Sequence, residues 1–527
     1  MDAQRVSGSA SWWLVMLLAC LLSACAGLPK VERQESYVVR DTVQTRLGQA
    51  AAPQLEAHPG QSGFFPLVQG IDAFAARMSL ARAAQRTLDL QYYIFHDDQT
   101  GLALIGELLA AAERGVRVRV LVDDIHTEGK DRSLAIADSH PNIEVRLFNP
   151  FAHRNARWLD FVGDFRRVNR RMHNKSMTAD NQATIVGGRN IGDEYFSAKT
   201  DVDFSDFDIL ALGPVVTEVS AQFDAYWNSA HAYPASAFNT GAPIGPDDYR
   251  ELRARVEERA ASLRNTAYAN AVQENELTQD IKRGEMEAYW GTATVIADPP
   301  DKLLLSAESS PALAITKLAK VLAQAQRELV LMSPYFVPGP RGVQWLQDMI
   351  RRGVHVKIIT NSFAATDVQA VHAGYTTYRT TLLKAGVELY EMKPTAYSER
   401  ARQGRQRGLT GSSRASLHAK TYMTDRRTLF VGSLNLDGRS AMLNTEMGVV
   451  LENEALCKML HDNLTGDILD VAYRVQLVTD AQTGNQHLTW ITREDGKEVI
   501  YDSEPEMSAF QKVIQGVLKI LPIEEQL

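Results

Sequence analysis

The 527-residue sequence contains one short pattern twice, and this repeat constrains the fold more than any other feature. In each copy a histidine is followed by a lysine two residues later and by an aspartate five residues after that: His173, Lys175, Asp180 and His418, Lys420, Asp425. A strand–helix–strand pattern precedes both copies, over residues 88–122 and 329–359. Because all these features recur roughly 240 residues apart, the repeat spans a whole domain and indicates two related halves.

The spacing of the histidine and the lysine predicts their chemistry. Residues i and i+2 of a β-strand point to the same face, so each half presents an imidazole beside an ammonium group. An imidazole can attack phosphorus or transfer a proton near neutral pH, and an ammonium can neutralise phosphate oxygens. We therefore expect one bipartite active site for chemistry at phosphorus, with no metal and no cofactor.

The residues that follow each motif suggest a phosphate pocket. Alternating runs over residues 176–186 and 421–431 predict hairpins that turn at Asp180 and Asp425, so turn chemistry alone explains these two aspartates. They stay in the candidate catalytic set as motif members, although we favour a structural role. Small residues then end each strand, and their amides and hydroxyl could bind an anion. The candidate phosphate ligands are Asn190, Ser433 and Asn435.

The duplicated motif resembles the HxKxxxxD signature of the phospholipase D superfamily. Residues 166–175, 187–192 and 443–448 are also similar to its bacterial cardiolipin synthase C branch, and the similarity extends from about residue 63 to the C-terminus. The resemblance implies an α/β fold: two homologous phospholipase D-like α/β/α sandwich halves, related by a pseudo-two-fold axis, with one active site at their interface.

The same resemblance implies site roles. His173 would attack the phosphodiester and form a phosphatidyl-histidine, while His418 protonates the departing alcohol; the reverse assignment stays open. Lys175 and Lys420 would hold the phosphate oxygens. Glu446 matches the carboxylate that contacts a histidine in the superfamily. The first half departs from that pattern, and we expect Asp208 to be the counterpart.

The implied activity is a phosphatidyltransferase that makes cardiolipin from phosphatidylglycerol and either phosphatidylethanolamine or a second phosphatidylglycerol. A small accessory protein is a further expected partner. The alternative is a phospholipase D that releases phosphatidic acid, because the motifs serve both reactions. A net charge of −8 disfavours a nuclease and any nucleic-acid partner, and two complete motifs disfavour a non-catalytic envelope lipid-binding protein.

The N-terminus predicts export. The apolar run over residues 12–22 has the length of a signal peptide, and it ends in Leu22-Ser23-Ala24-Cys25, which resembles a lipoprotein processing site. We expect cleavage after residue 24 and a lipid on Cys25, with an uncleaved anchor as the alternative. Ala26 favours the outer membrane, and the protein would face the periplasm. Cys457 has no remaining partner, so we expect no disulfide.

The domain boundaries follow from these patterns. We expect a signal peptide at 1–24, a tether at 25–60, the first half at 61–235, a helical connector at 236–300 and the second half at 301–527. The last unit would end in a hairpin at 487–501 and an apolar-striped helix that packs on the core or contacts a membrane. Arginines precede both motifs, and we expect them to attract anionic lipid headgroups. They are Arg166, Arg167, Arg170 and Arg171, then Arg400, Arg402, Arg405, Arg407 and Arg414.

Overall fold

The computed structural model describes residues 27–198, 203–239, 241–263, 266–283, 286–305, 310, 312–394 and 415–519. The expected signal peptide, Cys25 and the arginines from Arg400 to Arg414 lie outside these ranges. Within them, no helix combines the length and the apolar composition needed to cross a bilayer.

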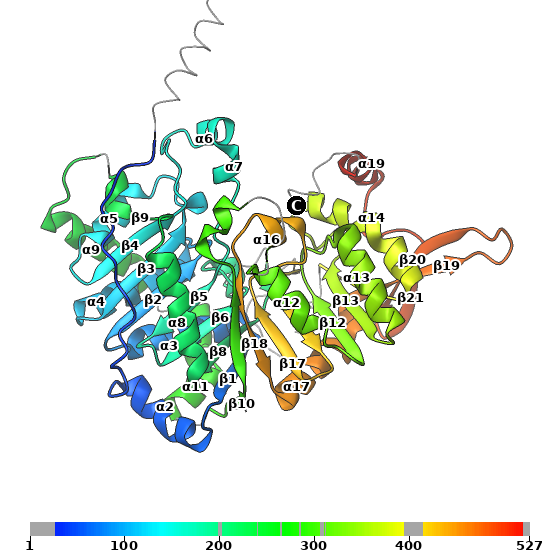
Figure 1. The fold of residues 1–527 in the computed structure, drawn as a ribbon, viewed down its shortest axis with the longest axis horizontal. Coiled ribbons are helices and arrows are strands. Elements are labelled where there is room, and N and C mark those ends of the chain that lie inside the picture. Colours follow the sequence, from blue (N-terminus) through cyan, green and yellow to red (C-terminus); the bar gives the residue numbers. More distant parts are fainter. Residues whose placement is uncertain are drawn as a thin grey trace, which may run out of the picture.

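Two mixed β-sheets lie side by side, one in each half (Figure 1). In spatial order the first sheet contains β10 (Tyr289–Gly291), β1 (Ser62–Leu67), β8 (Asp208–Leu212), β6 (Ala183–Gly187), β5 (Ser176–Ala179), β2 (Thr87–Tyr92), β3 (Arg117–Asp123), β4 (Ile143–Phe148) and β9 (Ala232–Pro234). The second contains β11 (Ala293–Ala297), β18 (Met447–Glu452), β17 (Thr428–Gly432), β16 (Lys420–Thr424), β12 (Glu328–Met332), β13 (His355–Asn361), β14 (Glu388–Met392), β19 (Ala472–Thr479), β20 (Gln486–Glu494) and β21 (Lys497–Tyr501). Strands β1-β8-β6-β5-β2-β3-β4 and β11-β18-β17-β16-β12-β13-β14 share one order, which confirms the duplicated α/β fold.

Helices cover the faces of both sheets. In the first half they are α2 (Arg46–Ala57), α3 (Gly70–Ala83), α4 (Gln99–Glu113), α5 (Asp131–Asp138), α6 (Trp158–Gly163), α7 (Phe165–Val168) and α8 (Pro214–Trp227). In the second half they are α12 (Ala314–Leu322), α13 (Gly339–Arg351), α14 (Gln369–Ala385), α16 (Gly438–Met442), α17 (Glu454–Thr465), α18 (Ile468–Val471) and α19 (Ala509–Leu518). The strand–helix–strand units predicted before each motif are β2-α4-β3 and β12-α13-β13.

One apolar core joins the halves. It combines buried residues of the first sheet and α8, such as Val186 and Val219, with residues of the second sheet and α17, such as Val449 and Cys457. Burial of this continuous surface provides the main driving force for association of the halves. The relative position of the two motifs is therefore fixed by packing.

The expected tether at 25–60 is corrected by the structure, because its described residues pack on the first half. The backbone N–H of Val38 donates to Asp224 Oδ2 at 2.8 Å, and the N–H of Ser36 donates to Asn228 Oδ1 at 3.1 Å. The Ser36 carbonyl in turn accepts a 2.9 Å hydrogen bond from buried Arg119. Polar partners on the first half thus hold a segment that lacks a periodic apolar pattern, and helix α2 follows it.

The segment between the halves contains the predicted helices, α9 (Pro246–Leu263), α10 (Ala267–Glu274) and α11 (Glu276–Arg283). Strands β10 and β11 follow, and they join the first and the second sheet, respectively. The connector therefore ends at Thr292, earlier than residue 300. The predicted C-terminal hairpin is present as β20 and β21, with Asp495 and Gly496 at positive φ in its turn.

Candidate active site

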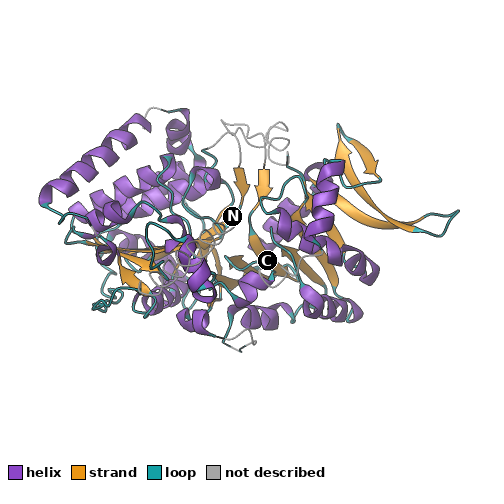
Figure 2. Ribbon diagram, turned by 90° about the horizontal axis from the view of Figure 1, so that it is seen from above, coloured by secondary structure: helices purple, strands orange, loops and turns teal. Residues whose placement is uncertain are grey.

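The two histidine segments each pair with the opposite half of the chain. The backbone N–H of His173 donates to the carbonyl of Thr445 at 2.9 Å, and the N–H of His418 donates to the carbonyl of Ser205 at 2.8 Å. The second contact continues a two-stranded parallel sheet, β7 (Asp203–Ser205) with β15 (Ala415–Leu417), which bridges the halves (Figure 2). These backbone contacts bring both motifs to the interface.

The carboxylate partners are crossed in the same way. His173 Nδ1 lies 2.9 Å from Glu446 Oε2, and His418 Nδ1 lies 2.6 Å from Asp206 Oδ2. All four side chains are buried, with His173 only 7% and His418 only 6% exposed. Among the described residues neither Nε2 has a hydrogen-bond partner, so Nε2 is the atom that each ring presents for chemistry.

The expectation that Asp208 orients a histidine is wrong. Asp208 instead accepts a 2.9 Å hydrogen bond from Arg77 Nη2 in a fully buried ion pair. Strand register identifies the equivalent positions: Gly432 pairs with Gly448 in the second half, and Gly187 pairs with Asp208 in the first. Glu446 and Asp206 each lie two residues before these partners. Residues two apart share a face of a strand, so alternation alone could not choose between Asp206 and Asp208.

The two lysines lie beside the histidines as the spacing predicted. Lys175 Nζ donates to the carbonyl of His173 at 2.7 Å, and Lys420 Nζ donates to the carbonyl of His418. An ammonium has three donors, so each lysine retains donors for a ligand. Burial lowers the pKa of Lys175 to about 7 and that of Lys420 to about 8. An anionic ligand would reverse this desolvation effect and favour the charged forms.

The imidazoles are also affected by burial. Desolvation lowers the pKa of His173 to about 4, although Glu446 opposes the shift. Desolvation and Lys420 likewise lower the pKa of His418, against the influence of Asp206. Burial acts to raise the pKa of Asp206, but His418 outweighs it and holds that pKa below its usual range. Burial thus acts against the charged form of both imidazoles, and the carboxylates beside them act in the opposite direction.

The two carboxylates have different hydrogen-bond environments. Glu446 accepts hydrogen bonds from the hydroxyls of Ser433 and Ser440, the latter at 2.8 Å. Asp206 accepts a 2.7 Å bond from the N–H of Phe207. No hydroxyl donor contacts Asp206 among the described residues. The hydroxyl donors share the negative charge of Glu446. Glu446 therefore stabilises a protonated imidazole less than Asp206 does.

The three candidate phosphate ligands differ in how many of their hydrogen-bonding groups already have partners. Ser433 donates its hydroxyl to the Glu446 carboxylate and so helps to position that carboxylate. The Asn190 amide accepts from the N–H of Ile94 at 3.1 Å and donates to the Tyr195 hydroxyl at 3.0 Å. Asn435 Oδ1 is buried and has no partner among the described residues. Of the three, Asn435 retains the most unused hydrogen-bonding capacity.

Asp180 and Asp425 direct their carboxylates at the backbone of the neighbouring strand. Asp180 Oδ1 accepts from the backbone N–H groups of Arg86 and Thr87, at 2.7 and 2.9 Å, just before and at the start of β2. Asp425 makes the equivalent contacts at the start of β12. Both lie at the far end of the motif hairpin from the histidines, and both have positive φ in its turn. Their carboxylates stabilise backbone, which is the structural role that turn chemistry favoured.

Most of the arginines before the first motif are structural as well. Arg171 is buried against Asp123 and the carbonyl of Asn149, and Arg170 donates to backbone carbonyls near residue 303. Arg167 pairs with Asp164. Unpaired buried backbone carbonyls are costly, which explains why guanidinium groups occupy these positions. Arg166 alone of the four has an exposed side chain.

Aromatic rings also line the site, and the sequence pattern did not single out these rings. The ring of Tyr93 lies 5.0 Å from His173, and Lys175 Nζ lies 5.5 Å from the centre of the same ring. Tyr195 and Phe204 flank His418 at 5.4 and 5.1 Å. Tyr93 directly follows β2. Its position just beyond the carboxyl end of a parallel strand is the sequence feature that could have identified it as a site residue.

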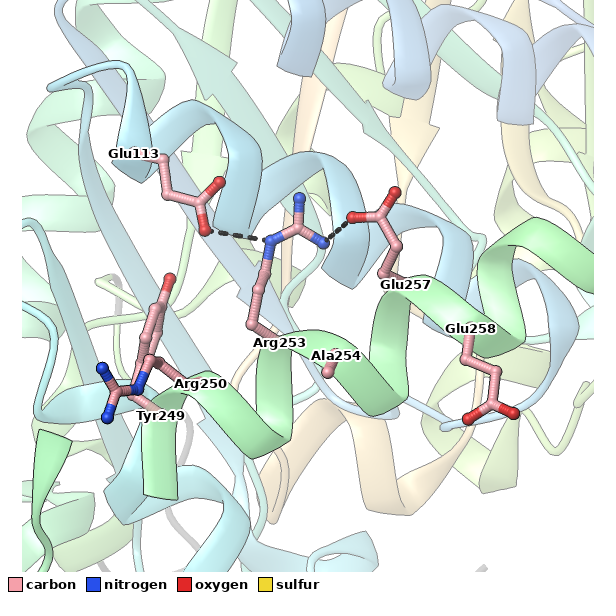
Figure 3. A pocket seen from close by; sticks show the side chains of 7 residues that line it. All are labelled: Glu113, Tyr249, Arg250, Arg253, Ala254, Glu257 and Glu258. Carbon is pink, nitrogen blue, oxygen red and sulfur yellow. Dashed lines mark hydrogen bonds and ion pairs between the residues drawn. The ribbon is translucent and has the colours of Figure 1, made fainter. Parts of the chain in front are cut away.

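A separate hollow lies between α4 and α9, away from the motifs (Figure 3). Arg253 spans it, with Glu113 at 2.9 Å and Glu257 at 2.6 Å. Ion pairs within the hollow already occupy Arg253, so we assign it to packing of the connector on the first half.

Comparisons with known proteins agree with this geometry. A family model described as "Cardiolipin synthase, PLD-like domain" matches twice, over residues 78–227 and 318–468. Cardiolipin synthase C from Escherichia coli is 43% identical over 91% of this chain and 99% of its own length. Cardiolipin synthase A from Pseudomonas syringae is 24% identical over 80% of this chain and 71% of its length. The crystal structure of phosphatidylserine synthase from Haemophilus influenzae has a TM-score of 0.56 at 12% identity, covering 91% of this chain and 100% of that one, and supports the fold.

Proposed function

Because the chain belongs to the phospholipase D-like cardiolipin synthase family, we propose that it is a phosphatidyltransferase that forms cardiolipin. The donor is phosphatidylethanolamine or phosphatidylglycerol, and the acceptor is a hydroxyl of phosphatidylglycerol. The observation that carries this proposal is the pair of crossed contacts, His173 with Glu446 and His418 with Asp206, which leaves two Nε2 atoms unpaired in one interface.

In the first step His173 Nε2 attacks the phosphorus of the donor. The new P–N bond forms as the bond from phosphorus to the headgroup oxygen breaks, and His418 Nε2–H donates its proton to that oxygen. The headgroup alcohol leaves. The phosphatidyl-imidazolium that remains is stabilised by the Glu446 carboxylate at Nδ1.

In the second step neutral His418 removes the proton from the acceptor hydroxyl. The acceptor oxygen bonds to phosphorus, the P–N bond breaks, and His173 is restored as a neutral ring. Attack by a glycerol hydroxyl gives cardiolipin, whereas attack by water gives phosphatidic acid. The catalytic residues are the same in both reactions, so exclusion of water must decide between them.

The different carboxylate environments support this division of labour. A low pKa keeps His173 unprotonated and available as a nucleophile. When an anionic phosphodiester binds, it favours protonation of the imidazoles. Protonation is favoured most at His418, because the ionised Asp206 carboxylate lies 2.6 Å from its Nδ1. Among the described residues, no hydroxyl group donates to that carboxylate.

The buried lysines supply charge to the transition state. Lys175 in the first half and Lys420 in the second would bind the non-bridging oxygens. The side-chain N–H groups of Asn435 would donate to the same oxygens. Preorganised cations in a water-poor site stabilise developing negative charge more strongly than they would in bulk water. This arrangement needs no metal ion or cofactor for its acid–base steps.

The proposed location is the cell envelope. A lipid on Cys25 would anchor the protein to a membrane with the active site facing the periplasm, and Ala26 favours the outer membrane. The substrates are membrane lipids, which fits an anchored enzyme. A small accessory protein remains part of this proposal, as an additional partner in the intact cell.

The test incubates the purified full-length protein with labelled phosphatidylglycerol, with and without phosphatidylethanolamine, and resolves the lipid products. We expect cardiolipin from the wild type and none from His173→Ala. His355→Ala, which removes an exposed histidine on β13, is the matched control and should keep full activity. Phosphatidic acid without cardiolipin would assign the protein to the hydrolases, and no lipid conversion would contradict the proposal.

A second experiment assigns the two histidines. Short incubation with labelled donor should leave acid-labile phosphatidyl label on His418→Asn protein and none on His173→Asn protein. The opposite pattern would exchange their roles.

A further inference from the structure

We propose that the α6–α7 segment is a membrane-contacting surface that holds the active site against the bilayer. Four side chains define this α6–α7 surface: Trp158, Phe161, Val162 and Phe165. They are 66%, 39%, 78% and 50% exposed, respectively. The inference builds on the proposed function, because it explains how lipid substrates reach the same site.

The polarity of α6 is reversed relative to an ordinary surface helix. Asp160 is 4% exposed and Arg157 is 7% exposed, while Trp158 and Val162 point outward on the same helical face. A surface helix of a soluble domain normally buries its apolar residues and exposes its charges. An exposed apolar cluster of this kind marks a protein or membrane contact.

The inward polar groups hold the surface rigidly. Asp160 accepts from both the N–H and the ring Nδ1 of His153, at 3.0 and 2.8 Å. Arg157 Nη1 donates to the carbonyl of Asp124 at 2.6 Å. Burial of these hydrogen bonds makes rotation of the segment costly, since each turned group would lose its partner. The apolar side chains therefore stay directed outward.

The same contacts connect the α6–α7 surface to the catalytic residues. Asp124 begins the short helical turn Asp124–His126 at the carboxyl end of β3. The ring of His126 lies 5.6 Å from Tyr93, which contacts His173. Beyond the end of α7, Met172 donates its backbone N–H to the Asp123 carboxylate at 2.7 Å. The surface and the site thus share one edge of the first sheet.

The N-terminal end of the described chain reaches that edge as well. Leu28 packs against Val122, Leu147 and Phe238, and the first two of these lie near the carboxyl ends of β3 and β4. In Figure 1 the first described residues leave the molecule on the side that carries α6 and α7. Cys25 lies three residues before Leu28, so a lipid there would be within about 10 Å of it. Such an anchor would face this edge toward the membrane.

The chemistry of the surface also suits a phospholipid bilayer. Tryptophan and phenylalanine are favoured at the level of the headgroups, where their rings meet the acyl boundary. Exposed Arg166 lies in α7 beside them and can approach anionic headgroups. The occupant that we propose is therefore a bilayer that contains phosphatidylglycerol, and a second copy of the chain is the competing occupant.

The first test measures insertion directly. The full-length protein is reconstituted into phosphatidylglycerol–phosphatidylethanolamine vesicles that contain lipids with nitroxide labels near the headgroup. Subtraction of the Trp158→Phe signal isolates the emission of Trp158, and we expect labelled lipid to quench at least half of it. Absence of quenching would overturn the proposal. Quenching that is lost on protein association at high concentration would instead identify a second copy as the occupant.

The second test compares substrates. The variant Trp158→Ser/Val162→Ser/Phe165→Ser should lose at least tenfold of its activity on bilayer lipids, with less than a twofold change on monomeric short-chain phosphatidylglycerol. Val478→Ser/Ile500→Ser, exposed apolar positions on β19 and β21, is the matched control and should match wild type on both substrates. Equal losses on both substrates would contradict a membrane role. Absence of activity in the wild type would count against the proposed function only, because quenching is independent of turnover.

Discussion

His418 is held by Asp206, a residue of the opposite half, through a 2.6 Å contact between Nδ1 and Oδ2. The reciprocal contact joins His173 to Glu446. In the proposed mechanism, neither half therefore contains a complete catalytic unit. The duplication produced one site that depends on both halves, and a shared apolar core keeps them in register.

Asp206→Asn should reduce kcat by about 10²- to 10⁴-fold with little change in stability. An amide can donate to Nδ1, which would place the wrong tautomer at Nε2. Asp208→Asn is the contrasting variant. It leaves Arg77 without its buried charge partner and should cost about 3–5 kcal/mol of folding free energy. Lipid turnover and urea unfolding of both proteins check this, and equal kcat losses would refute the assignment.

Gly188→Ala should mimic the loss of Asp206. A Cβ at this position would overlap the Asp206 carboxylate, so the carboxylate must move away from His418. We expect kcat to fall by at least about tenfold while the protein remains folded. Gly106→Ala in α4 is the control, since its Cβ would meet Val256 at an ordinary 3.7 Å. Steady-state assays measure kcat, and circular dichroism shows whether each variant is folded. A fully active Gly188→Ala protein would contradict the prediction.

The stability of the protein should fall as the pH drops from about 6.5 to 4. The pKa of His173 is lowered from 6.5 to about 4 in the folded state, so the unfolded chain binds a proton first. Protonation of the unfolded chain lowers the free energy of unfolding by up to about 3 kcal/mol across this pH range. Above the pKa of the unfolded state, the free energy of unfolding is unaffected. His173→Gln should show a shallower decline in urea midpoints over the same range. Parallel curves for the two proteins would argue against a neutral, buried His173.

Asp180→Ala should destabilise the protein by about 2–4 kcal/mol and leave the kcat of the folded fraction within a few-fold of wild type. The carboxylate accepts three backbone N–H groups around the start of β2, and alanine would leave them unpaired. Asp425→Ala should cost less because that side chain is partly exposed. Thermal melts and active-site titration with labelled donor check this, and a stable but inactive protein would restore Asp180 to the catalytic set.

The sequence by itself determined the duplication, the strand–helix–strand succession before each motif and the histidine–lysine pairs. These features are local, because alternation along a strand fixes which side chains share a face, and Asp180-Asn181 or Asp425-Arg426 dictate a turn. The carboxyl partner of His173 was also accessible through a family resemblance at Glu446.

Only the tertiary structure decided which residues meet across the interface. Asp206 and Asp208 are equivalent in local pattern, and strand pairing between distant segments selected the first for His418 and the second for Arg77. Likewise, the inward direction of Arg171 and the outward direction of Trp158 depend on partners far away in sequence. Local propensity carries no information about such contacts, because their free energy arises only when the two halves pack.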